Sequence, residues 1–263
     1  MPEGDAVLRT ARRLDASLAG APLAVADLRW GHVDGERLHC ACTLAVVAVG
    51  KHLLHRLDNG LTLHTHLRMD GRWQTLPVSA VTPAQRRAPG LRALLATQTT
   101  AALGWHLGLV EIVRTRDEAD VVGHLGPDLL GGDWNEALAL SNLMSAPERP
   151  IAEALLDQRN LAGLGTIFTS EPLFMQQIHP WTRVGALPAD RIRALVRRGQ
   201  ELLQVSMTYG HPCSTGHRRE PMYVFGRKGR PCRRCGTTLR HITVGEPPRE
   251  RVLTYCSRCQ PEA

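Results

Sequence analysis

The chain has 263 residues, of which 43% are hydrophobic and 4% aromatic, and its formal net charge is +7. This length suffices for two domains and a small appendage, and the shortage of aromatic residues predicts cores of Leu, Val and Ala. No apolar run reaches the roughly 18 residues of a membrane span, and no basic and apolar leader opens the chain. We therefore expect a cytoplasmic protein with no membrane partner.

The charge is unevenly distributed along the chain. Residues 1–180 carry 16 Lys and Arg against 19 Asp and Glu, a net charge of −3. Residues 181–263 carry 16 against 6, a net charge of +10. This asymmetry predicts a polyanionic partner for the C-terminal part. Only two of the 32 cationic residues are lysines, so Lys51 and Lys228 are conspicuous in an arginine-rich chain.

The first residues are Met1-Pro2-Glu3-Gly4. Removal of Met1 would leave Pro2 with a free secondary amine, and a terminal amine titrates near about pH 8, so part of it is unprotonated at neutral pH. Such an amine can attack an electrophilic carbon and form an iminium intermediate. Glu3 places a carboxyl group next to it that can move protons. An ordinary frayed terminus is the alternative that these residues alone leave open.

A helix is predicted over Asp5–Ala19, because its apolar residues recur at helical spacing. From residue 23 to about 116, short Val, Leu and Thr runs alternate with turn residues, which predicts an all-β sandwich or barrel-like domain. Asp58-Asn59-Gly60 predicts a hairpin, and the proline-containing segment 77–90 a loop. The predicted strands are Thr43–Val49, His52–Leu57, Leu61–Leu67, Thr99–Leu103 and Leu109–Thr115.

After Gly131-Gly132 the pattern becomes helical. Asp133 is the candidate N-cap of the first helix, with Glu136 at capping-box spacing. The glycine-bearing segment 158–165 predicts either a phosphate-binding helix start or a plain turn between helices. Residues 208–230 are polar and predict a loop. Helices are expected over 134–145, 150–157, 166–176 and 188–206.

Two cysteine pairs lie near the C-terminus, Cys232-x2-Cys235 and Cys256-x2-Cys259, with 20 residues between them. This spacing is typical of a zinc ribbon, in which four thiolates hold one Zn²⁺ with no open catalytic position. Disulfides are the alternative, which a cytosolic protein disfavours. The segment is short and polar, so the metal is expected to be structural. Cys40 and Cys42, on a predicted strand, are expected to pack in the core.

Seven segments and the cysteine pairs together carry a resemblance to one protein family. They are Met1-Pro2-Glu3-Gly4, Gly50-Lys51-His52-Leu53-Leu54, His64-Thr65-His66-Leu67-Arg68-Met69-Asp70-Gly71, His124-Leu125-Gly126-Pro127-Asp128, Leu155-Leu156-Asp157-Gln158, Leu161-Ala162-Gly163-Leu164-Gly165 and Phe225-Gly226-Arg227-Lys228-Gly229. With the cysteines, they make the chain resemble the formamidopyrimidine-DNA glycosylase / endonuclease VIII family over nearly its whole length. The actinobacterial endonuclease VIII branch is the most similar.

The resemblance implies a multidomain α and β protein. Residues 1–125 would form an N-terminal helix plus β-sandwich catalytic domain, residues 126–225 a helix–two-turn–helix DNA-binding domain, and residues 226–263 a zinc-ribbon hairpin. The implied function is base-excision repair by a bifunctional DNA glycosylase and AP lyase. Its substrates would be oxidised bases, pyrimidines above all, in double- or single-stranded DNA. We expect a monomer in the bacterial cytoplasm, associated with the nucleoid.

The resemblance also implies catalytic roles. Pro2 would attack C1′ of the damaged nucleotide and expel the base, while Glu3 would assist sugar-ring opening and proton transfer. Lys51, on a strand after Gly50, would contact a phosphate and aid base loss or elimination. Arg251, five residues before Cys256, would hold a phosphate bidentately and favour the second elimination. A solvated strand lysine and a generic basic residue are the alternatives for Lys51 and Arg251.

Four further residues would contact the DNA. Met69, beside Arg68, would fill the gap left by the flipped base, and core packing is the alternative for Met69. His124 aligns with a family position near DNA, with a buried turn histidine as the alternative. Thr166 would clamp backbone phosphates, although the family usually has Asn there. The Asp-Pro-Arg-Arg-Phe-Gly loop of the formamidopyrimidine branch is missing, and Thr99–Gly108 occupies its place.

Two other functions are compatible with parts of the sequence. A zinc-dependent damaged-DNA-binding protein with lost or weak chemistry would keep the basic C-terminal part, and Thr166 is the main hint of it. A proline-based tautomerase would also need a free Pro2, but the basic ribbon argues against a small-molecule enzyme.

Overall fold

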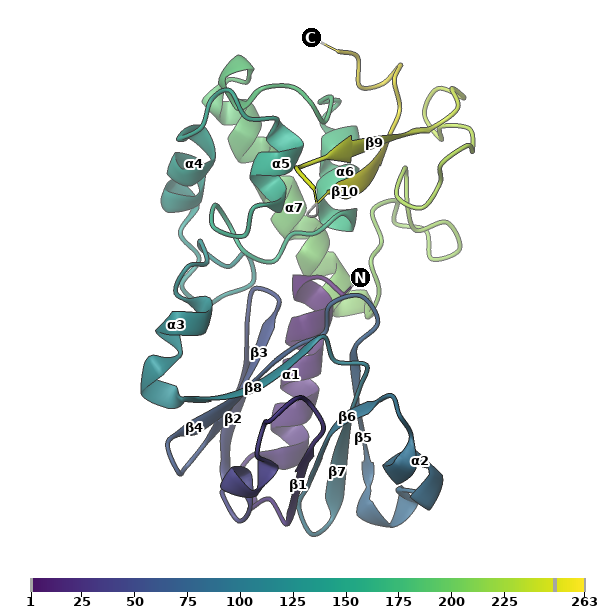
Figure 1. Ribbon diagram of the computed structural model, residues 1–263. Coiled ribbons are helices and arrows are strands. Elements are labelled where there is room, and N and C mark those ends of the chain that lie inside the picture. Colours follow the sequence, from purple (N-terminus) through teal and green to yellow (C-terminus); the bar gives the residue numbers. More distant parts are fainter. Residues whose placement is uncertain (1, 248–249, 263) are drawn as a thin grey trace. The chain divides into compact units, whose positions relative to one another are not determined.

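A computed structural model of the protein describes residues 2–247 and 250–262 (Figure 1). The chain divides into two compact units, Met1–His124 and Leu125–Ala263. No helix among the described residues is both long enough and apolar enough to cross a membrane. The predicted combination of a helix plus β-sandwich, a helical domain and a C-terminal cysteine-bearing hairpin is confirmed.

The first unit consists of helix α1 (Gly4–Leu18) and two four-stranded antiparallel sheets. One sheet has the order β2-β3-β4-β8, with β2 Thr43–Val49, β3 His52–Leu57, β4 Leu61–His66 and β8 Leu109–Arg114. The other has the order β1-β6-β7-β5, with β1 Val25–Leu28, β5 Arg72–Pro77, β6 Leu91–Ala96 and β7 Thr100–Trp105. Short helical elements lie between the strands, namely η1 Gly35–Leu38, η2 Val78–Ala80 and α2 Pro83–Arg87, and two more follow β8, η3 Thr115–Asp117 and α3 Ala119–Val122.

Helix α1 is held in the first unit by one apolar face. Its fully buried residues recur three and four apart, which puts them on a single side of the helix. They join a cluster that contains Leu53 and Trp73 from the strands. Asp15 of α1 accepts the Val46 N–H at 2.8 Å and so ties the helix to β2. This packing fixes the residues that immediately precede the helix.

Three strands of the first unit, β1, β5 and β6, were not predicted from the sequence. β6 is apolar at almost every position, and β5 mixes charged, aromatic and aliphatic residues, so neither shows a clear alternation. The segment 77–90 is not simply a loop, since it contains α2, capped by Thr82. The expectation for Cys40 and Cys42 was wrong. Cys40 is exposed with φ of 63°, and Cys42 is only half-buried, because the chain turns there after η1.

The second unit contains four longer helices and one hairpin. They are α4 Glu136–Met144, α5 Ile151–Leu156, α6 Ile167–Met175 and α7 Ala189–Tyr209, with η4 Val184–Ala186 between α6 and α7, and the strands β9 Arg240–Val244 and β10 Arg251–Tyr255. Asn135, not Asp133, caps α4 by accepting the Leu138 N–H at 3.0 Å. Helix α7 ends at Tyr209, before Gly210 with φ of 77°, and so runs past the predicted end.

The hairpin shares its core with the helices of the second unit. Val244 of β9 and Leu253 of β10 lie in the same hydrophobic cluster as Leu164, Phe168 and Leu203. Gly245 donates its N–H to Glu153 of α5 at 3.0 Å. The cysteine-bearing hairpin is therefore packed onto the helices, and its folding is coupled to theirs.

A buried carboxylate on α6 holds the long segment that leads to the hairpin. Glu171 is 1% exposed and accepts the backbone N–H groups of Tyr223, Val224 and Phe225 at 2.9, 2.9 and 2.7 Å. The Ser214 hydroxyl donates to the same carboxylate. Two oxygens thus accept from four donors, of which the Val224 N–H is fully buried.

Replacement of this carboxylate tests its role. In Glu171→Gln the amide nitrogen would face N–H donors, so we expect a loss of about 3 kcal/mol in the free energy of unfolding of the second unit. Urea denaturation of the full chain measures it. Glu201→Gln on the exposed face of α7 removes only a surface ion pair with Arg198 and should cost less than about 1 kcal/mol. Equal losses in the two variants would contradict the role of Glu171.

Candidate functional site

The N-terminal residues are anchored by the helix that follows them. Glu3 is the N-cap residue of α1, with φ of −112°, and its carbonyl oxygen accepts the Val7 N–H at 3.1 Å. Glu3 is 1% exposed and Pro2 is half-buried. Asp5, in the first turn, is also buried and pairs with Arg9 at 3.0 Å. The start of the chain is therefore built into the first unit, unlike the frayed terminus considered above.

Lys51 lies in the turn between β2 and β3. Val49 pairs with His52, so Gly50 and Lys51 form a two-residue hairpin loop, and Gly50 takes the positive φ of 57° at its first position. The sequence had suggested a strand position for Lys51, whereas the structure places it at the tip of the hairpin. Lys51 is half-buried, and its charge acts on the nearby His66.

Four histidines and one carboxylate gather beside this turn. His52 faces His66 across β3 and β4, and His64 faces Glu111 across β4 and β8. His52 Nδ1 lies 2.8 Å from His64 Nε2, and His64 Nδ1 lies 2.7 Å from Glu111 Oε1. The His124 ring lies edge-on to that of His52, with centroids 6.3 Å apart. His124 is exposed, so the buried alternative for this residue is wrong.

Burial and neighbouring positive charge keep two of these imidazoles neutral. Burial, followed by His66, His64, His124 and Arg68, lowers the pKa of His52 to about 3. Burial, followed by Arg68, Lys51 and His64, lowers the pKa of His66 to about 4. His52 and His66 therefore add hydrogen-bonding groups rather than charge at neutral pH.

This cluster was not predicted from the sequence, although its signal was present. Residues 64 and 66 of one strand point to the same face, because side chains alternate along a strand. The β3–β4 register then places His52 opposite His66. That register is not supplied by composition alone.

A tight turn after β4 displays Arg68 and Met69. Arg68 has φ of 54°, and Gly71 closes the turn with its N–H to Leu67 O at 2.9 Å. A Cβ at Gly71 would lie 2.3 Å from that oxygen, so only glycine fits there. Met69 is 62% exposed, which rules out core packing for it. An exposed methionine on a rigid turn is suited to enter a gap in a partner.

Thr166 is the N-cap residue of α6, at the end of the glycine-bearing turn 158–165. Its side chain makes no capping hydrogen bond to the helix. Gln158 holds the turn by donating to Leu156 O and Leu164 O at 2.8 and 3.0 Å, and Gly163 takes φ of 107°. The turn is thus a fixed backbone structure at a helix start, a geometry that favours anions.

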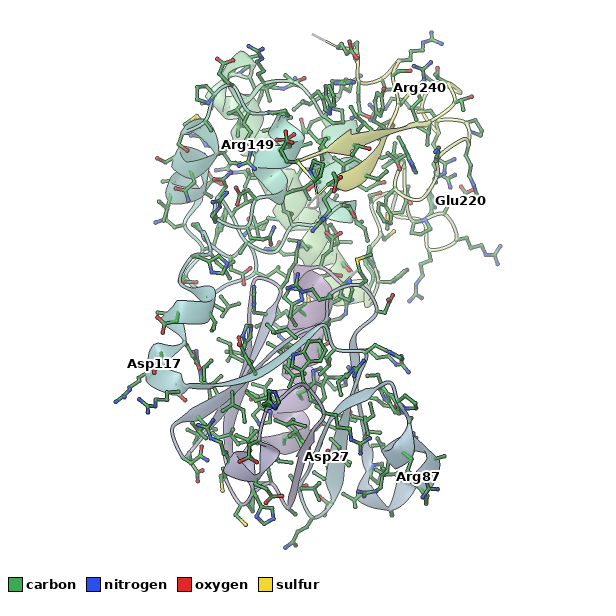
Figure 2. All side chains as sticks on the ribbon, in the orientation of Figure 1. Asp27, Arg87, Asp117, Arg149, Glu220 and Arg240 are labelled. Atoms are coloured by element: carbon green, nitrogen blue, oxygen red, sulfur yellow. The ribbon has the colours of Figure 1, made fainter. Side chains whose placement is uncertain are left out.

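Arginines flank the start of this turn, and one of them, Arg149, is labelled in Figure 2. Asp157 accepts from Arg159 at 2.7 Å and from Arg149 at 2.8 Å. The Arg159 hydrogen bond, opposed by burial and assisted by Arg149, lowers the pKa of Asp157 well below its usual range. The ionised carboxylate orients both guanidinium groups beside the turn.

Arg251 is the first residue of β10 and pairs with Val244 at the end of β9. It is exposed, and its Nη1 donates to Glu250 O at 2.9 Å. Arg240, the first residue of β9 and labelled in Figure 2, adds a second arginine to the same hairpin. Part of the positive charge expected of the C-terminal segment is therefore presented on one hairpin.

The four cysteines meet as the sequence predicts. Their sulfur atoms all lie within 4.8 Å of one another, with Cys232 and Cys259 3.9 Å apart and Cys235 and Cys256 3.5 Å apart. A disulfide needs about 2.05 Å. A tetrahedral zinc with Zn–S bonds of about 2.3 Å has sulfurs about 3.8 Å apart. The donor set fits a closed structural zinc site.

The arrangement was compared with known proteins. The family model of the formamidopyrimidine-DNA glycosylase N-terminal domain matches residues 1–105, and that of the formamidopyrimidine-DNA glycosylase H2TH domain matches residues 125–216. A Lactococcus lactis formamidopyrimidine-DNA glycosylase, solved bound to DNA containing an abasic site, superimposes with a TM-score of 0.84. Its sequence is 23% identical, and the match covers 99% of this chain and 100% of that one.

Several named relatives are similar over their full length. "Probable endonuclease 8 2" of Streptomyces coelicolor is 44% identical, covering 99% of this chain and 94% of its own. "Endonuclease 8 2" of Mycobacterium tuberculosis is 40% identical, covering 99% and 100%. "DNA-(apurinic or apyrimidinic site) lyase Nei2" of Mycolicibacterium smegmatis is 38% identical, covering 99% of both. The chain belongs to the formamidopyrimidine-DNA glycosylase / endonuclease VIII family.

Proposed function

We propose that the protein is a bifunctional DNA glycosylase and AP lyase of base-excision repair that acts through Pro2. The observation that carries the proposal is the anchored start of the chain, with half-buried Pro2 next to the buried carboxyl group of Glu3 at the N-terminus of α1. The full-length similarity to proteins named endonuclease 8 and AP lyase supports the same chemistry.

The reaction requires Met1 to be removed, so that Pro2 carries a free amine. The positive end of α1 disfavours a protonated amine there, which keeps the nucleophile reactive. Its nitrogen attacks C1′ of the damaged nucleotide, the C1′–base bond breaks, and the base leaves with a proton. The C1′–O4′ bond of the sugar then opens, O4′ takes up a proton, the amine loses its proton, and an iminium forms. Loss of a C2′ proton expels the 3′ phosphate, and a second elimination expels the 5′ phosphate. Glu3 is the group next to the nucleophile that can move these protons.

The other candidate residues act on the DNA backbone and the gap. Lys51 and Arg251 supply cations for phosphates, with Arg251 favouring the second elimination. Met69 and Arg68 enter the space left by the flipped base. Thr166, with the turn before it, and His124 contact the backbone. These assignments rest on the family resemblance, the exposure of Met69 and His124, and the fixed turn at Thr166.

The cysteine cluster is proposed to hold one structural Zn²⁺. The ion would be bound by Cys232, Cys235, Cys256 and Cys259, leaving no open position for substrate. The ion would join the two ends of the hairpin that carries Arg251. The three segments 1–125, 126–225 and 226–263 then serve catalysis, backbone clamping and phosphate binding, and the protein acts as a monomer in the bacterial cytoplasm, at the nucleoid.

A DNA-binding protein with lost chemistry is the competing function. It would keep the zinc hairpin and the basic surface but would form no covalent adduct with DNA. Covalent trapping therefore separates the two.

Borohydride reduction of the protein on abasic-site DNA should give a covalent complex, because borohydride reduces an iminium. Pro2→Gly should abolish or greatly weaken trapping, whereas the exposed Pro261→Gly should leave it unchanged. Glu3→Gln should slow the reaction about 100- to 10,000-fold. Gel electrophoresis measures the adduct, and the intact mass of the protein should show that Met1 has been removed. Undiminished trapping by Pro2→Gly would move the nucleophile elsewhere, with Lys51 next in line.

Elemental analysis should find one zinc per chain. Cys256→Ser should lose the metal and the affinity for DNA, because the hairpin that presents Arg251 opens, while the first unit stays folded by circular dichroism. Cys40→Ser, an exposed cysteine of the first unit, should keep both metal and affinity. Full DNA affinity in the zinc-free protein would refute the assigned role.

The structure of residues 99–108 supports a proposal for the substrate choice. These residues form β7 and a short turn into β8, so the Arg and Phe loop that supports the opposite strand in the formamidopyrimidine branch has no counterpart here. We expect cleavage of thymine glycol and dihydrouracil in both single- and double-stranded DNA, since unpairing costs nothing in a single strand. Activity on 8-oxoguanine opposite cytosine should be weak. Cytosine-dependent excision of 8-oxoguanine without cleavage of oxidised pyrimidines would contradict this specificity.

A further inference from the structure

A chain of hydrogen bonds leads from β8 to the end of β3 beside the Lys51 turn. Glu111 Oε1 lies 2.7 Å from His64 Nδ1, and His64 Nε2 lies 2.8 Å from His52 Nδ1. The His52 and His64 rings stack with their centroids 5.0 Å apart. His64 is 2% exposed, so its protons exchange through these partners.

The carboxylate sets the direction of the hydrogen bonds. An ionised carboxylate only accepts, so His64 Nδ1 carries a proton. When His64 is neutral, its Nε2 accepts from His52 Nδ1–H, and His52 Nε2 is left with a lone pair. When His64 is protonated, its Nε2–H donates to His52 Nδ1, and a neutral His52 must carry its proton on Nε2.

We propose that Glu111, His64 and His52 form a proton relay that serves DNA bound at the Lys51 turn, an inference that rests on the proposed function. A proton that reaches His52 Nε2 forms an N–H bond there. The proton on His52 Nδ1 moves to His64 Nε2, and the positive charge comes to rest on His64 beside Glu111. His52 Nε2 thereby changes from an acceptor to a donor for a phosphate oxygen while its ring stays neutral.

The neighbouring charges favour this distribution. Arg68 repels a charge on His52 or His66, and burial lowers the pKa of both rings, to about 3 and about 4, so neither is charged above pH 5. On the other side, the negative charge of Glu118 attracts a positive charge on His64. Burial opposes the ionised form of Glu118, but the hydrogen bond from Arg56 helps to outweigh burial, and the pKa of Glu118 is lowered. A proton taken up by the relay is therefore stabilised on His64.

His66 differs from His52 in having a fixed tautomer. The Arg68 N–H donates to His66 Nδ1 at 2.9 Å, so the proton of the neutral His66 ring is on Nε2 at all times. His66 offers a permanent donor and His52 a switchable one. His52 and His64 are positioning residues, because neither is assigned a contact with the reacting atoms.

Imidazole nitrogen-15 shifts of the DNA-free protein test the relay without any variant. On acidification the proton of His52 should move from Nδ1 to Nε2, because a proton added at Nε2 passes the Nδ1 proton to His64. In Glu111→Gln the side-chain oxygen still accepts from His64 but the charge is gone, so the His52 tautomer should stay the same on acidification. An unchanged His52 tautomer in the wild-type protein would overturn the proposal.

Binding to a duplex with an uncleavable tetrahydrofuran site tests the link to DNA, at one salt concentration throughout. If one proton is taken up with the DNA, the association constant rises by up to about tenfold for each unit by which the pH falls. This gain should be lost in Glu111→Gln and kept in the control His39→Gln, an exposed histidine of the same unit. Loss of the gain in His124→Gln but not in Glu111→Gln would assign the proton to His124 and overturn the relay.

The relay and the proposed function would be contradicted by different results. Binding with the same pH dependence in the wild-type protein and Glu111→Gln overturns the relay and leaves the proposed function intact. Absence of binding at every pH overturns the proposed function, and with it the role of the relay toward DNA.

Discussion

The registers of the β2-β3-β4 hairpins set most of the chemistry of the first unit. Because Val49 pairs with His52 in the β2–β3 register, Lys51 is held at the tip of that hairpin, and the positive φ of Gly50 makes the turn possible. The β3–β4 register places His52 opposite His66 and within hydrogen-bonding distance of His64. A slip of one residue would send every side chain of β3 to the other face of the sheet.

In the second unit, the C-terminal hairpin and the helices depend on each other. Val244 and Leu253 lie in the helical core, and Gln260 donates to Ile178 O at 2.8 Å while accepting the Cys256 N–H at 3.0 Å. The four-cysteine cluster therefore closes a structure whose apolar half is already shared with the helices. Net positive charge on such a rigid support binds a polyanion without the entropic cost of ordering a flexible tail.

Much of this structure follows from the sequence by itself. β2 and β3 begin and end where the alternation of Val, Leu and polar residues predicts, and the cysteine spacing led to the four-sulfur cluster. Fully apolar β6 has no periodicity to distinguish strand from helix. The N-cap of α4 was misplaced by two residues, because Asn135 and Asp133 are both good caps and only packing selects between them.

Some residues of the candidate site also follow from the sequence, and others do not. Pro2, Glu3 and the cysteines were identified from local patterns, since their chemistry needs only neighbours in the sequence. Lys51 was identified but placed on a strand, because its turn depends on pairing across the hairpin. The His52, His64 and Glu111 chain comes from three strands and depends on two registers at once, so no single stretch of sequence displays it.

Glu171 binds the loop before the hairpin through three main-chain N–H groups and one hydroxyl. Such an anchor recognises the path of the backbone and places no demand on the side chain of Phe225, whereas Val224 and Tyr223 also pack with Phe174. Substitutions of Phe225 can change what the loop touches while its position stays the same. The protein thus has a position at which recognition can diverge by point mutation without loss of the fold.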